Sequence, residues 1–254
     1  MFATAVLLLL VASTACSTAV PICDTPTGGE TPVLPQTGTA RNLPAPPPDV
    51  TLKKIVLGFG IQNYTCATVG GSADAAGALA MLYDVSALYP GQGHESLSPR
   101  GFESLTGWAL RNHKVPLNLN KSAAGRVEPT SPGASTTRPF PADAPLRLPG
   151  MKALPFLGHH YFDSNGIPVF VLDRGRIKLS ATKLAMVDAP KRASKGPEGT
   201  GAVSWLFLGS KQGTAAVGAK FVYRVFTAGG VSHGCGKAAG QDSTSYTAMY
   251  WFYG

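Results

Sequence analysis

Five polar residues could do chemistry in this 254-residue sequence: Gln62, Asp84, His160, Asp173 and Arg224. Each lies in or beside a short apolar run, so a fold could bring them together in its interior. A histidine, a carboxylate and an arginine are groups that acid–base catalysis uses. One hypothesis is therefore a hydrolase that uses His160, Asp84 and Asp173. The other is structural, with His160 and Gln62 satisfying buried backbone groups and Arg224 paired with a carboxylate. We favour the structural interpretation.

Other catalytic signatures are scarce. The chain has 14 Asp and Glu residues, and Asp84 with Asp173 is the one pair that could serve as the two carboxylates of a glycosidase. His159 and His160 are adjacent, and neighbouring residues of a strand point to opposite faces, so the two cannot bind one metal ion. No nucleophile elbow, phosphate-binding loop or zinc-ligand spacing occurs. We therefore predict no metal and no cofactor.

The stretch KKIVLGFGIQNYTC, residues 53–66, raises the question of a dinucleotide site. Such a site needs Gly-x-Gly-x-x-Gly between a strand and a helix, whose N-terminal amides hold the pyrophosphate, and an acid about 20 residues later. Asp84 has that spacing, but the sixth position of the motif is Asn63. The residues that follow lack a helical period. The stretch therefore predicts one long strand, in which Gly58 and Gly60 allow a bulge or a close backbone approach.

Exposed aromatic side chains offer a binding function as the competing hypothesis. On the surface of a sheet they could stack on sugar rings, and the candidates are Tyr161, Tyr223, Tyr246, Trp205 and Trp251. For Trp205 and Trp251 we expect a place in the core instead. A ligand pocket would use polar residues of the same segments, and its candidates are Gln62, His160, Tyr161 and Arg224.

The N-terminus predicts export from the cell. An apolar run from Ala5 to Ala12 is followed by small residues, with a cleavage site near residues 17–19, which is the pattern of a signal peptide over residues 1–19. A lipid-attached form through Cys16 is the alternative. No segment reaches the roughly 20 apolar residues that a membrane span needs. We expect a secreted, extracellular protein without a membrane span.

Three cysteines remain after this cleavage, in a compartment where thiols pair. Cys66 ends the predicted long strand and Cys235 lies in a glycine-rich loop before the last strand. We therefore predict a disulfide between Cys66 and Cys235. The alternative is a catalytic pair of Cys235 with His233. Cys23 is then unpaired or joined to another molecule.

Two acceptor sites for N-linked glycans gain meaning from the predicted export. They are Asn63-Tyr64-Thr65 and Asn120-Lys121-Ser122. A glycan on Asn63 requires that its side chain face solvent, which argues against a cofactor buried at the same place.

The positive charge of the chain is localised. The net charge is +8, and residues 100–195 hold 15 Lys and Arg against 6 Asp and Glu. No basic run is interleaved with aromatic residues, so we expect no nucleic-acid partner. The basic region could contact carbohydrate or an acidic cell-surface polymer. We favour the alternative, a solvated surface that keeps the protein soluble.

Proline-rich stretches divide the chain. Residues 20–50 are typical of an extended tether. Residues 89–155 are proline-rich and poor in β-branched and aromatic residues, which predicts a partly disordered basic insertion. Within it, SPRGFESLTGWALRNH predicts one short helix with Phe102, Leu105 and Ala109 on a shared face.

The rest of the chain predicts a single, mainly β domain over residues 51–254, an antiparallel sandwich or barrel with little helix. Expected strands are residues 52–66, 76–83, 158–162, 168–172, 176–182, 202–208, 220–227 and 245–253. DSNG predicts a hairpin with positive φ at both Asn165 and Gly166. The last strand carries aromatic residues on both faces, which predicts a central place in the sheet.

Several motifs together resemble a secreted family of unknown function that is common in fungi and also found in bacteria. They are GFGIQNYTC, ALAMLYD, GHHYFDSNGIPVFVLD, VSWLFLGS, VYRVFTAGG followed by Cys235, and SYTAMYWFY, over roughly residues 50–88 and 155–254. Members are often labelled malate dehydrogenase by automatic transfer. The resemblance implies a secreted β domain without an established reaction. Many fungal relatives carry a cysteine near position 87, where this chain has Ala87, which would leave Cys23 without a partner.

These observations favour a non-catalytic extracellular or cell-wall-associated binding module, with carbohydrate or an acidic cell-surface polymer as its partner. The alternatives are a hydrolase built on His160, Asp84 and Asp173, and, least favoured, an NAD-dependent malate dehydrogenase. The residues themselves give the dehydrogenase label no support.

Overall fold

The computed structural model describes residues 30–38 and 41–254. The predicted signal peptide and Cys23 lie outside the described residues, as does part of the proline-rich stretch 20–50. Within the described part of the chain, no helix is both long and apolar enough to cross a membrane.

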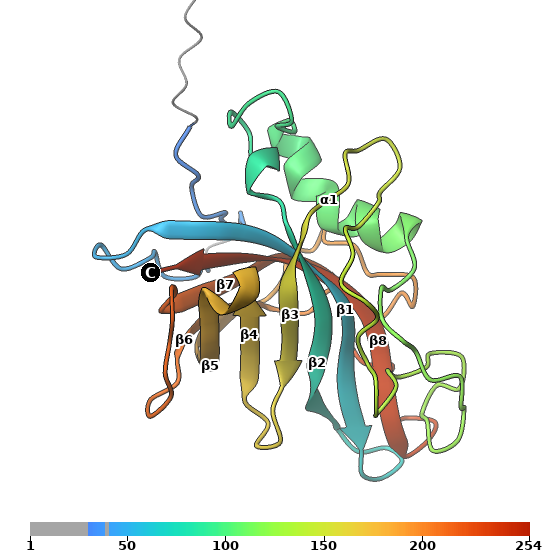
Figure 1. Cartoon of the computed structure of the whole chain (residues 1–254). Helices are drawn as coiled ribbons and strands as arrows, with labels where there is room; N and C mark the ends of the chain where they lie inside the picture. The colour runs from blue at the N-terminus through green and yellow to red at the C-terminus, as the bar shows by residue number, and fades with distance from the viewer. Residues whose placement is uncertain (1–29, 39–40) are drawn as a thin grey trace, which may run out of the picture.

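Eight antiparallel strands form a closed barrel in which each strand pairs with the next along the chain and β1 pairs with β8 (Figure 1). The strands are β1 (Leu52–Cys66), β2 (Ala73–Asp84), β3 (Phe156–Phe162), β4 (Pro168–Leu172), β5 (Ile177–Val187), β6 (Trp205–Ser210), β7 (Phe221–Gly229) and β8 (Gly240–Tyr253). The described chain adds one α-helix, α1 (Pro99–Asn112), and two short 3-10 helices, η1 (Ser86–Leu88) and η2 (Asp173–Gly175). The predicted antiparallel β fold is confirmed, and of the two expected architectures it is the barrel.

Both faces of β1 and β8 are buried, so the barrel carries two hydrophobic clusters. Val56 and Tyr250 belong to the interior cluster, whereas Ile55, Leu57 and Trp251 belong to an outer cluster. This alternation follows from the period of two along a strand. The predicted central place of the last strand is confirmed, because β8 pairs with both β1 and β7.

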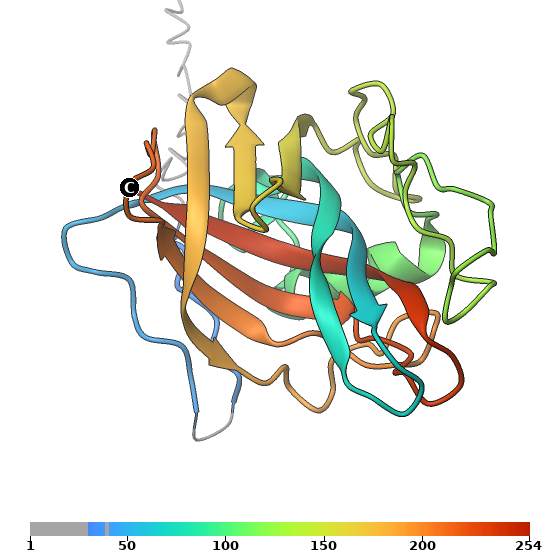
Figure 2. The same cartoon turned by 90° about the horizontal axis from the view of Figure 1, so that it is seen from below.

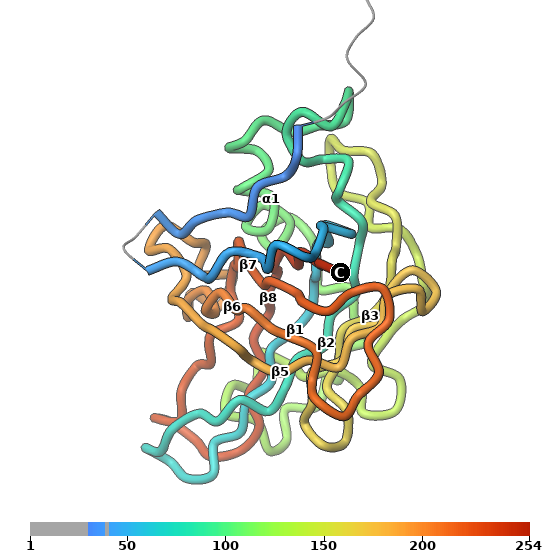
Figure 3. The backbone as a smooth tube through the Cα atoms, turned by 90° about the vertical axis from the view of Figure 1, so that its left-hand side faces the viewer, coloured from blue at the N-terminus to red at the C-terminus, as the bar shows by residue number. Residues whose placement is uncertain are grey.

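The hydrogen bonding between β1 and β8 continues beyond the two strands. Thr51 and Gly254 exchange two backbone hydrogen bonds of 3.1 Å each. The segment that leads into β1 therefore lies beside the C-terminus (Figure 3). The closing seam of the barrel is hydrogen-bonded beyond the strands themselves.

Segments outside the barrel cover the outer cluster. Figure 2 shows α1 and the segment after it on one side of the barrel. Leucines from the N-terminal segment and from the segment after α1 are buried in this cluster: Leu34, Leu43, Leu117, Leu146, Leu148 and Leu154. The outer faces of the aromatic-rich strands are thereby removed from water, which is the main favourable term in folding.

Residues 89–155 differ from the partly disordered insertion expected from their composition. The segment has a described course throughout, and its few apolar residues dock on the barrel. A composition of this kind predicts disorder only for a segment that must bury its apolar surface on its own. This segment does not need to, because the outer face of the barrel supplies the partner surface. That these residues are an insertion stays a prediction.

The predicted helix is confirmed as α1. Ser98 caps it by accepting a hydrogen bond of 3.1 Å from the Gly101 backbone N, and Pro99 occupies the first turn. Phe102 and Leu105 are buried against the barrel. The Thr247 hydroxyl of β8 donates a buried 2.8 Å hydrogen bond to the Thr106 carbonyl oxygen, which fixes α1 along the sheet.

The predicted disulfide between Cys66 and Cys235 is confirmed, with 5.4 Å between the two Cα atoms. It joins the end of β1 to the loop before β8 across 169 residues of sequence. In the entropy model, a loop of this length destabilises the unfolded chain by about 5 kcal/mol. The sulfur of Cys235 is therefore not a free thiol beside His233.

The hairpin between β3 and β4 differs from the predicted turn. Gly166 has a φ of 70°, but Asn165 is not among the residues with positive φ. Instead the Asp163 carboxylate accepts 2.9 Å hydrogen bonds from the backbone N of Asn165 and of Ile167. The aspartate side chain therefore shapes the turn, and only one residue needs the left-handed conformation.

Gly58 and Gly60 lie inside β1, as predicted, and residues 61–66 continue the strand. No helix follows the Gly-x-Gly pair, so the phosphate-binding geometry of a dinucleotide fold is not formed there. A Cβ on Gly60 would overlap the Leu79 carbonyl oxygen and lie 2.7 Å from the Ala80 Cα. The close backbone approach expected for these glycines is confirmed.

We predict that Gly60→Ala destabilises the protein by roughly 3 kcal/mol, the upper end of the usual cost of overpacking, because backbone atoms of β2 must shift. Gly236→Ala is the matched control, since a Cβ there meets nothing within 4 Å. Urea unfolding of both variants measures the effect. Equal stability of the two variants would contradict the strand packing described here.

Candidate functional site

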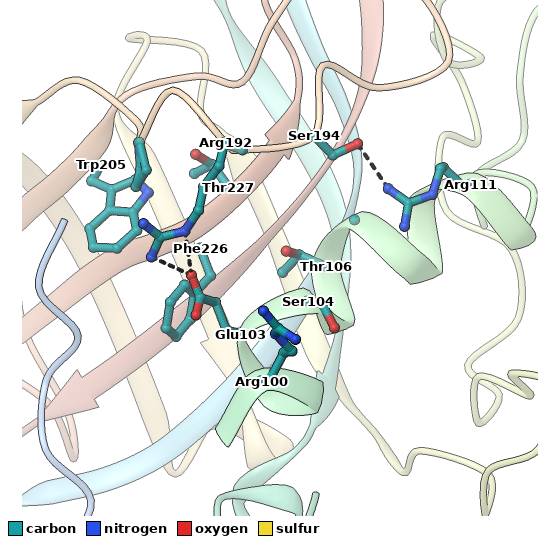
Figure 4. Close-up of a pocket in the computed structure, with 13 residues that line it drawn as sticks. Arg100, Glu103, Ser104, Thr106, Arg111, Arg192, Ser194, Trp205, Phe226 and Thr227 are labelled. Carbon is teal, nitrogen blue, oxygen red and sulfur yellow. Dashed lines mark hydrogen bonds and ion pairs between the residues drawn. The ribbon is translucent and has the colours of Figure 1, made fainter. Parts of the chain in front are cut away.

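A pocket of about 530 Å³ lies between α1, the loop that joins β5 to β6, and the outer face of β6 and β7 (Figure 4). We call it the α1 pocket. Residues from three distant parts of the sequence line it, including Arg100 and Arg111 of α1, Arg192 of the loop, and Trp205 and Phe226 of the strands.

One face of α1 forms a wall of the α1 pocket. Arg100, Ser104, Gly107 and Arg111 are spaced by three or four residues, which places them on one side of a helix. Gly107 allows the loop to approach, because a Cβ there would lie 3.0 Å from the Ser194 Cβ. The sequence of the helix therefore divides into a buried apolar side and a pocket side.

The charges around the α1 pocket are mainly positive, with three arginines and one carboxylate among its lining residues. Arg192 donates to the Glu103 carboxylate through Nε at 2.9 Å and through Nη2 at 2.6 Å. Arg111 Nη1 donates to Ser194 Oγ at 3.3 Å. Arg100 forms no ion pair or hydrogen bond with the described residues, so its guanidinium is free for a ligand.

The strand side of the α1 pocket is aromatic. The rings of Trp205 and Phe226 meet edge to face, with 5.5 Å between centroids. Phe226 has a φ of 47° and lies where the register of β7 against β8 shifts. The indole N–H of Trp205 is buried and has no hydrogen-bond partner among the described residues. An apolar surface thus faces the arginine-rich wall.

This arrangement is chemically suited to binding anions. A guanidinium presents donors in a planar fork that matches a carboxylate or sulfate group. The single carboxylate of the α1 pocket, Glu103, is held by Arg192 and has no second acid beside it. The geometry therefore supports recognition of negative charge next to an apolar face.

His160 lies inside the barrel, away from the α1 pocket. Its ring stacks on Phe170 with 4.1 Å between centroids, and Nδ1 lies 2.9 Å from the Val169 carbonyl oxygen. Burial lowers the pKa of His160 to about 4; the Val169 carbonyl opposes this shift and the charge of Arg224 adds to it. The expected backbone hydrogen bond is confirmed, and the ring is neutral at physiological pH.

Asp84 and Asp173 do not join His160. Asp84 pairs with Lys54 at 2.7 Å and Asp173 pairs with Arg176 at 2.7 Å. His160 is the register partner of Ala80 in β2 and of Phe170 in β4. Asp84 is therefore about 13 Å further along the sheet and Asp173 about 10 Å, at 3.3 Å per residue.

The environment of Asp84 is that of a structural ion pair. Burial alone raises the pKa of Asp84, but hydrogen bonds from Lys54 and Ser86 outweigh it and lower the pKa below its usual value. A general acid needs a raised pKa, so Asp84 is poorly suited to that role.

Arg224 points to the barrel interior, where its charge acts on the pKa values of His160 and Tyr250. The prediction that Arg224 pairs with a carboxylate is wrong, because Arg224 forms no ion pair with the described residues. It donates to the Ser204 carbonyl oxygen through Nε at 3.2 Å and Nη2 at 2.9 Å. Gln62 is also buried in the barrel.

The aromatic residues considered for sugar stacking are mostly in the core. Trp205 is 2% exposed, and Tyr223, Tyr246 and Trp251 are fully buried. The core position expected for the two tryptophans is confirmed, and the surface position considered for Tyr223 and Tyr246 is wrong. Tyr161 alone of the five is partly exposed.

A polar group that the sequence analysis did not identify lies beside the disulfide. Asp242 accepts from Ser232 Oγ at 2.6 Å, and its other oxygen lies 2.8 Å from His233 Nδ1. In a nucleophilic triad the histidine stands between the serine and the carboxylate, whereas here both bind the carboxylate directly. The group therefore holds the loop next to Cys235 in place. The spacing of these residues in the sequence gave no signal for the group, because their contacts form only when the chain folds.

Comparison with known proteins gives a family but no relative of known activity. The sequence profile of a family described as "Protein of unknown function (DUF3455)" matches residues 46–254. The chain belongs to this family. No curated protein and no solved structure matches the DUF3455 chain.

The two glycosylation acceptors of this DUF3455 chain lie in different surroundings. Asn63 is half-buried in β1 and its Oδ1 accepts a 2.8 Å hydrogen bond from Ser243 Oγ. Asn120 is exposed in the segment after α1. Glycosylation of either stays a prediction. No group of three or more His, Cys, Asp or Glu side chains is arranged to hold a metal ion in the described part of the chain.

We predict that His160 makes the stability of this DUF3455 domain depend on pH. Free histidine titrates near 6.5, and the folded pKa is about 4. Both states are neutral at pH 7.5. As the pH falls from 6.5 to 4, the unfolded chain takes up a proton that the folded chain does not, which costs on the order of 3 kcal/mol of folding stability.

Urea unfolding between pH 7.5 and pH 4 measures this loss. His160→Phe removes the titrating group and keeps an aromatic ring against Phe170, so the pH dependence should become flatter. His94→Asn is the control, because the His94 side chain is 93% exposed. Identical pH slopes for the wild type and His160→Phe would show that another group is responsible.

Proposed function

We propose that this DUF3455 protein is a secreted, extracellular binding module that recognises acidic polysaccharide through the α1 pocket. One observation carries the proposal: three arginines line a single pocket that also has an aromatic side. Export is supported by the N-terminal sequence and by a disulfide, which forms in oxidising compartments. The proposed role is non-catalytic, since the one carboxylate that lines the α1 pocket is held by Arg192.

The spacing of the arginines favours a polymer over a small anion. Arg100 and Arg111 are eleven residues apart on α1, which corresponds to about 16 Å along the helix axis. A single carboxylate or sulfate ion could not contact both. A chain with repeated negative charges could contact Arg100, Arg192 and Arg111 in turn, with an apolar sugar face against Phe226.

The hydrolase alternative has less support. Its residues, His160, Asp84 and Asp173, are separated along the barrel and do not line the α1 pocket. A dehydrogenase function has even less support, because the Gly-x-Gly stretch is part of a strand. The binding proposal draws on residues that meet in a pocket.

We predict that Arg100→Ala with Arg192→Ala weakens binding of a polyuronate such as polygalacturonate by about five- to thirtyfold. Two exposed charge interactions of about 0.5 to 1 kcal/mol each would give this loss. Affinity electrophoresis at low ionic strength, with a neutral glucan as the reference polymer, measures it. Binding should also weaken as salt is added, since salt screens exposed charges.

The control for this experiment is Lys178→Ala with Lys183→Ala. Both lysines are exposed on β5 and neither lines the α1 pocket. This pair removes the same net charge at a different place. If both double variants lose affinity equally, the polymer responds to overall charge and the α1 pocket is not its site. If the wild type does not bind polyuronate at all, the proposal fails.

We also predict that Glu103→Gln raises polyuronate affinity by about two- to fivefold. Glu103 competes with the ligand for Arg192, and removing an exposed ion pair releases up to about 1 kcal/mol for the new contact. Glu128→Gln is the matched control, because Glu128 is partly exposed, like Glu103, and lies outside the α1 pocket. An equal gain in both variants would assign the effect to net charge.

A further inference from the structure

A second pocket, of about 440 Å³, lies between the C-terminal end of β1, the N-terminal end of β8 and the segment after α1. We call it the sequon pocket, because Asn63 and Asn120, the two acceptor asparagines, both line it. They are 57 positions apart in the sequence, and one lies in β1 and the other in the segment after α1. Folding therefore brings both glycosylation acceptors to one cavity.

The segment after α1 is fixed where it forms this pocket. Val127 N donates to the Gln241 carbonyl oxygen at 2.8 Å, and Gln241 N donates to the Gly125 carbonyl oxygen at 2.9 Å. These two bonds attach the segment to the start of β8. Asn120 N donates to the Gly133 carbonyl oxygen at 2.7 Å, which closes a loop around the mouth of the pocket.

Hydroxyl and amide side chains predominate in the lining of the sequon pocket, beside one arginine, one aspartate and one tyrosine. Thr65, Thr136 and Gln241 line it with side chains that make no hydrogen bond among the described residues. Arg126 donates from Nε to the Ser131 carbonyl oxygen at 2.8 Å, while its Nη2 is buried without a partner in the described chain. Such a set of unused donors and acceptors suits a polyhydroxyl ligand.

The two acceptor asparagines differ in their readiness to carry a glycan. The side chain of Asn63 is half-buried and bonded to Ser243, as described above. Asn120 is exposed; its Oδ1 accepts a 3.0 Å hydrogen bond from Ser122 N, and its Nδ2 has no partner among the described residues. The nitrogen to which a sugar would be attached is therefore free at Asn120.

We propose that Asn120 carries an N-linked glycan and that the first sugars of this glycan lie in the sequon pocket. The occupant is argued from two independent observations: an acceptor side chain in the pocket wall and a lining with unused polar groups. The inference depends on export through a glycosylating secretory pathway, and it does not depend on polysaccharide binding at the α1 pocket.

The modification itself requires a lipid-linked oligosaccharide pyrophosphate and the transferase of the host cell. A bond forms between Asn120 Nδ2 and C1 of the first sugar, while the bond from C1 to the pyrophosphate oxygen breaks. The lipid pyrophosphate leaves, and the amide loses one proton to solvent. No oxidation or reduction is involved.

The test uses the full chain secreted from a eukaryotic host that attaches N-linked glycans. Peptide mapping by mass spectrometry, before and after enzymatic removal of the glycan, should locate sugar on Asn120. Hydrogen exchange then compares this protein with Ser122→Ala, which removes the acceptor sequence but keeps the backbone N that bonds to Asn120. We expect the amides of residues 118–135 to exchange on the order of tenfold more slowly in the glycosylated protein.

Ser122→Thr is the matched control, because it keeps the acceptor sequence and should keep both the glycan and the slow exchange. Absence of sugar on Asn120, or sugar on Asn63 alone, would overturn the proposal. A glycan on Asn120 that leaves the exchange of residues 118–135 unchanged would also overturn it, since the sugars would then extend into solvent. Polyuronate binding should be the same in the wild type and Ser122→Ala.

Discussion

The pairing of β1 with β8 is the constraint on which the rest of the structure depends. These two strands join the start of the domain to its last residues, and the register runs from Leu52 with Tyr253 to Cys66 with Gly240. Because the middle of β1 and the C-terminal half of β8 are apolar on both faces, closing the barrel buries only half of these apolar side chains. The other half requires a second layer, and this requirement determines where the remaining chain must lie.

That second layer creates the candidate sites. α1 packs its apolar side on β7 and β8, so its polar side faces the loop before β6 and forms the α1 pocket. The segment after α1 continues down the barrel and is bonded to the start of β8, where it forms the sequon pocket. Neither pocket belongs to the barrel interior, which is filled by aliphatic and aromatic side chains. In this DUF3455 chain the barrel acts as a scaffold and the covering segments carry the accessible polar chemistry.

Local patterns predicted much of this architecture. Strand periodicity located all eight strands, the Ser-Pro start and apolar spacing located α1, and the positions of Cys66 and Cys235 predicted their disulfide. The predictions that differed involved contacts between distant segments. Composition alone suggested disorder for residues 89–155, because the surface on which their leucines dock comes from other parts of the chain. The same limit applies to Arg224, whose partner is a backbone carbonyl that no motif encodes.

The sequence by itself determined the strand-rich fold class, the positions of its strands and helix, the crosslink and the family, because these depend on side-chain periodicity and on short motifs. Tertiary structure decided which side chains share a pocket. Arg100, Arg192 and Trp205 are far apart in the chain and become neighbours only when α1 docks on the closed barrel. His160, Asp84 and Asp173 were considered as a hydrolase group from their motifs and stay apart in the fold. Strand register, which long-range pairing sets, places them at different heights along the sheet.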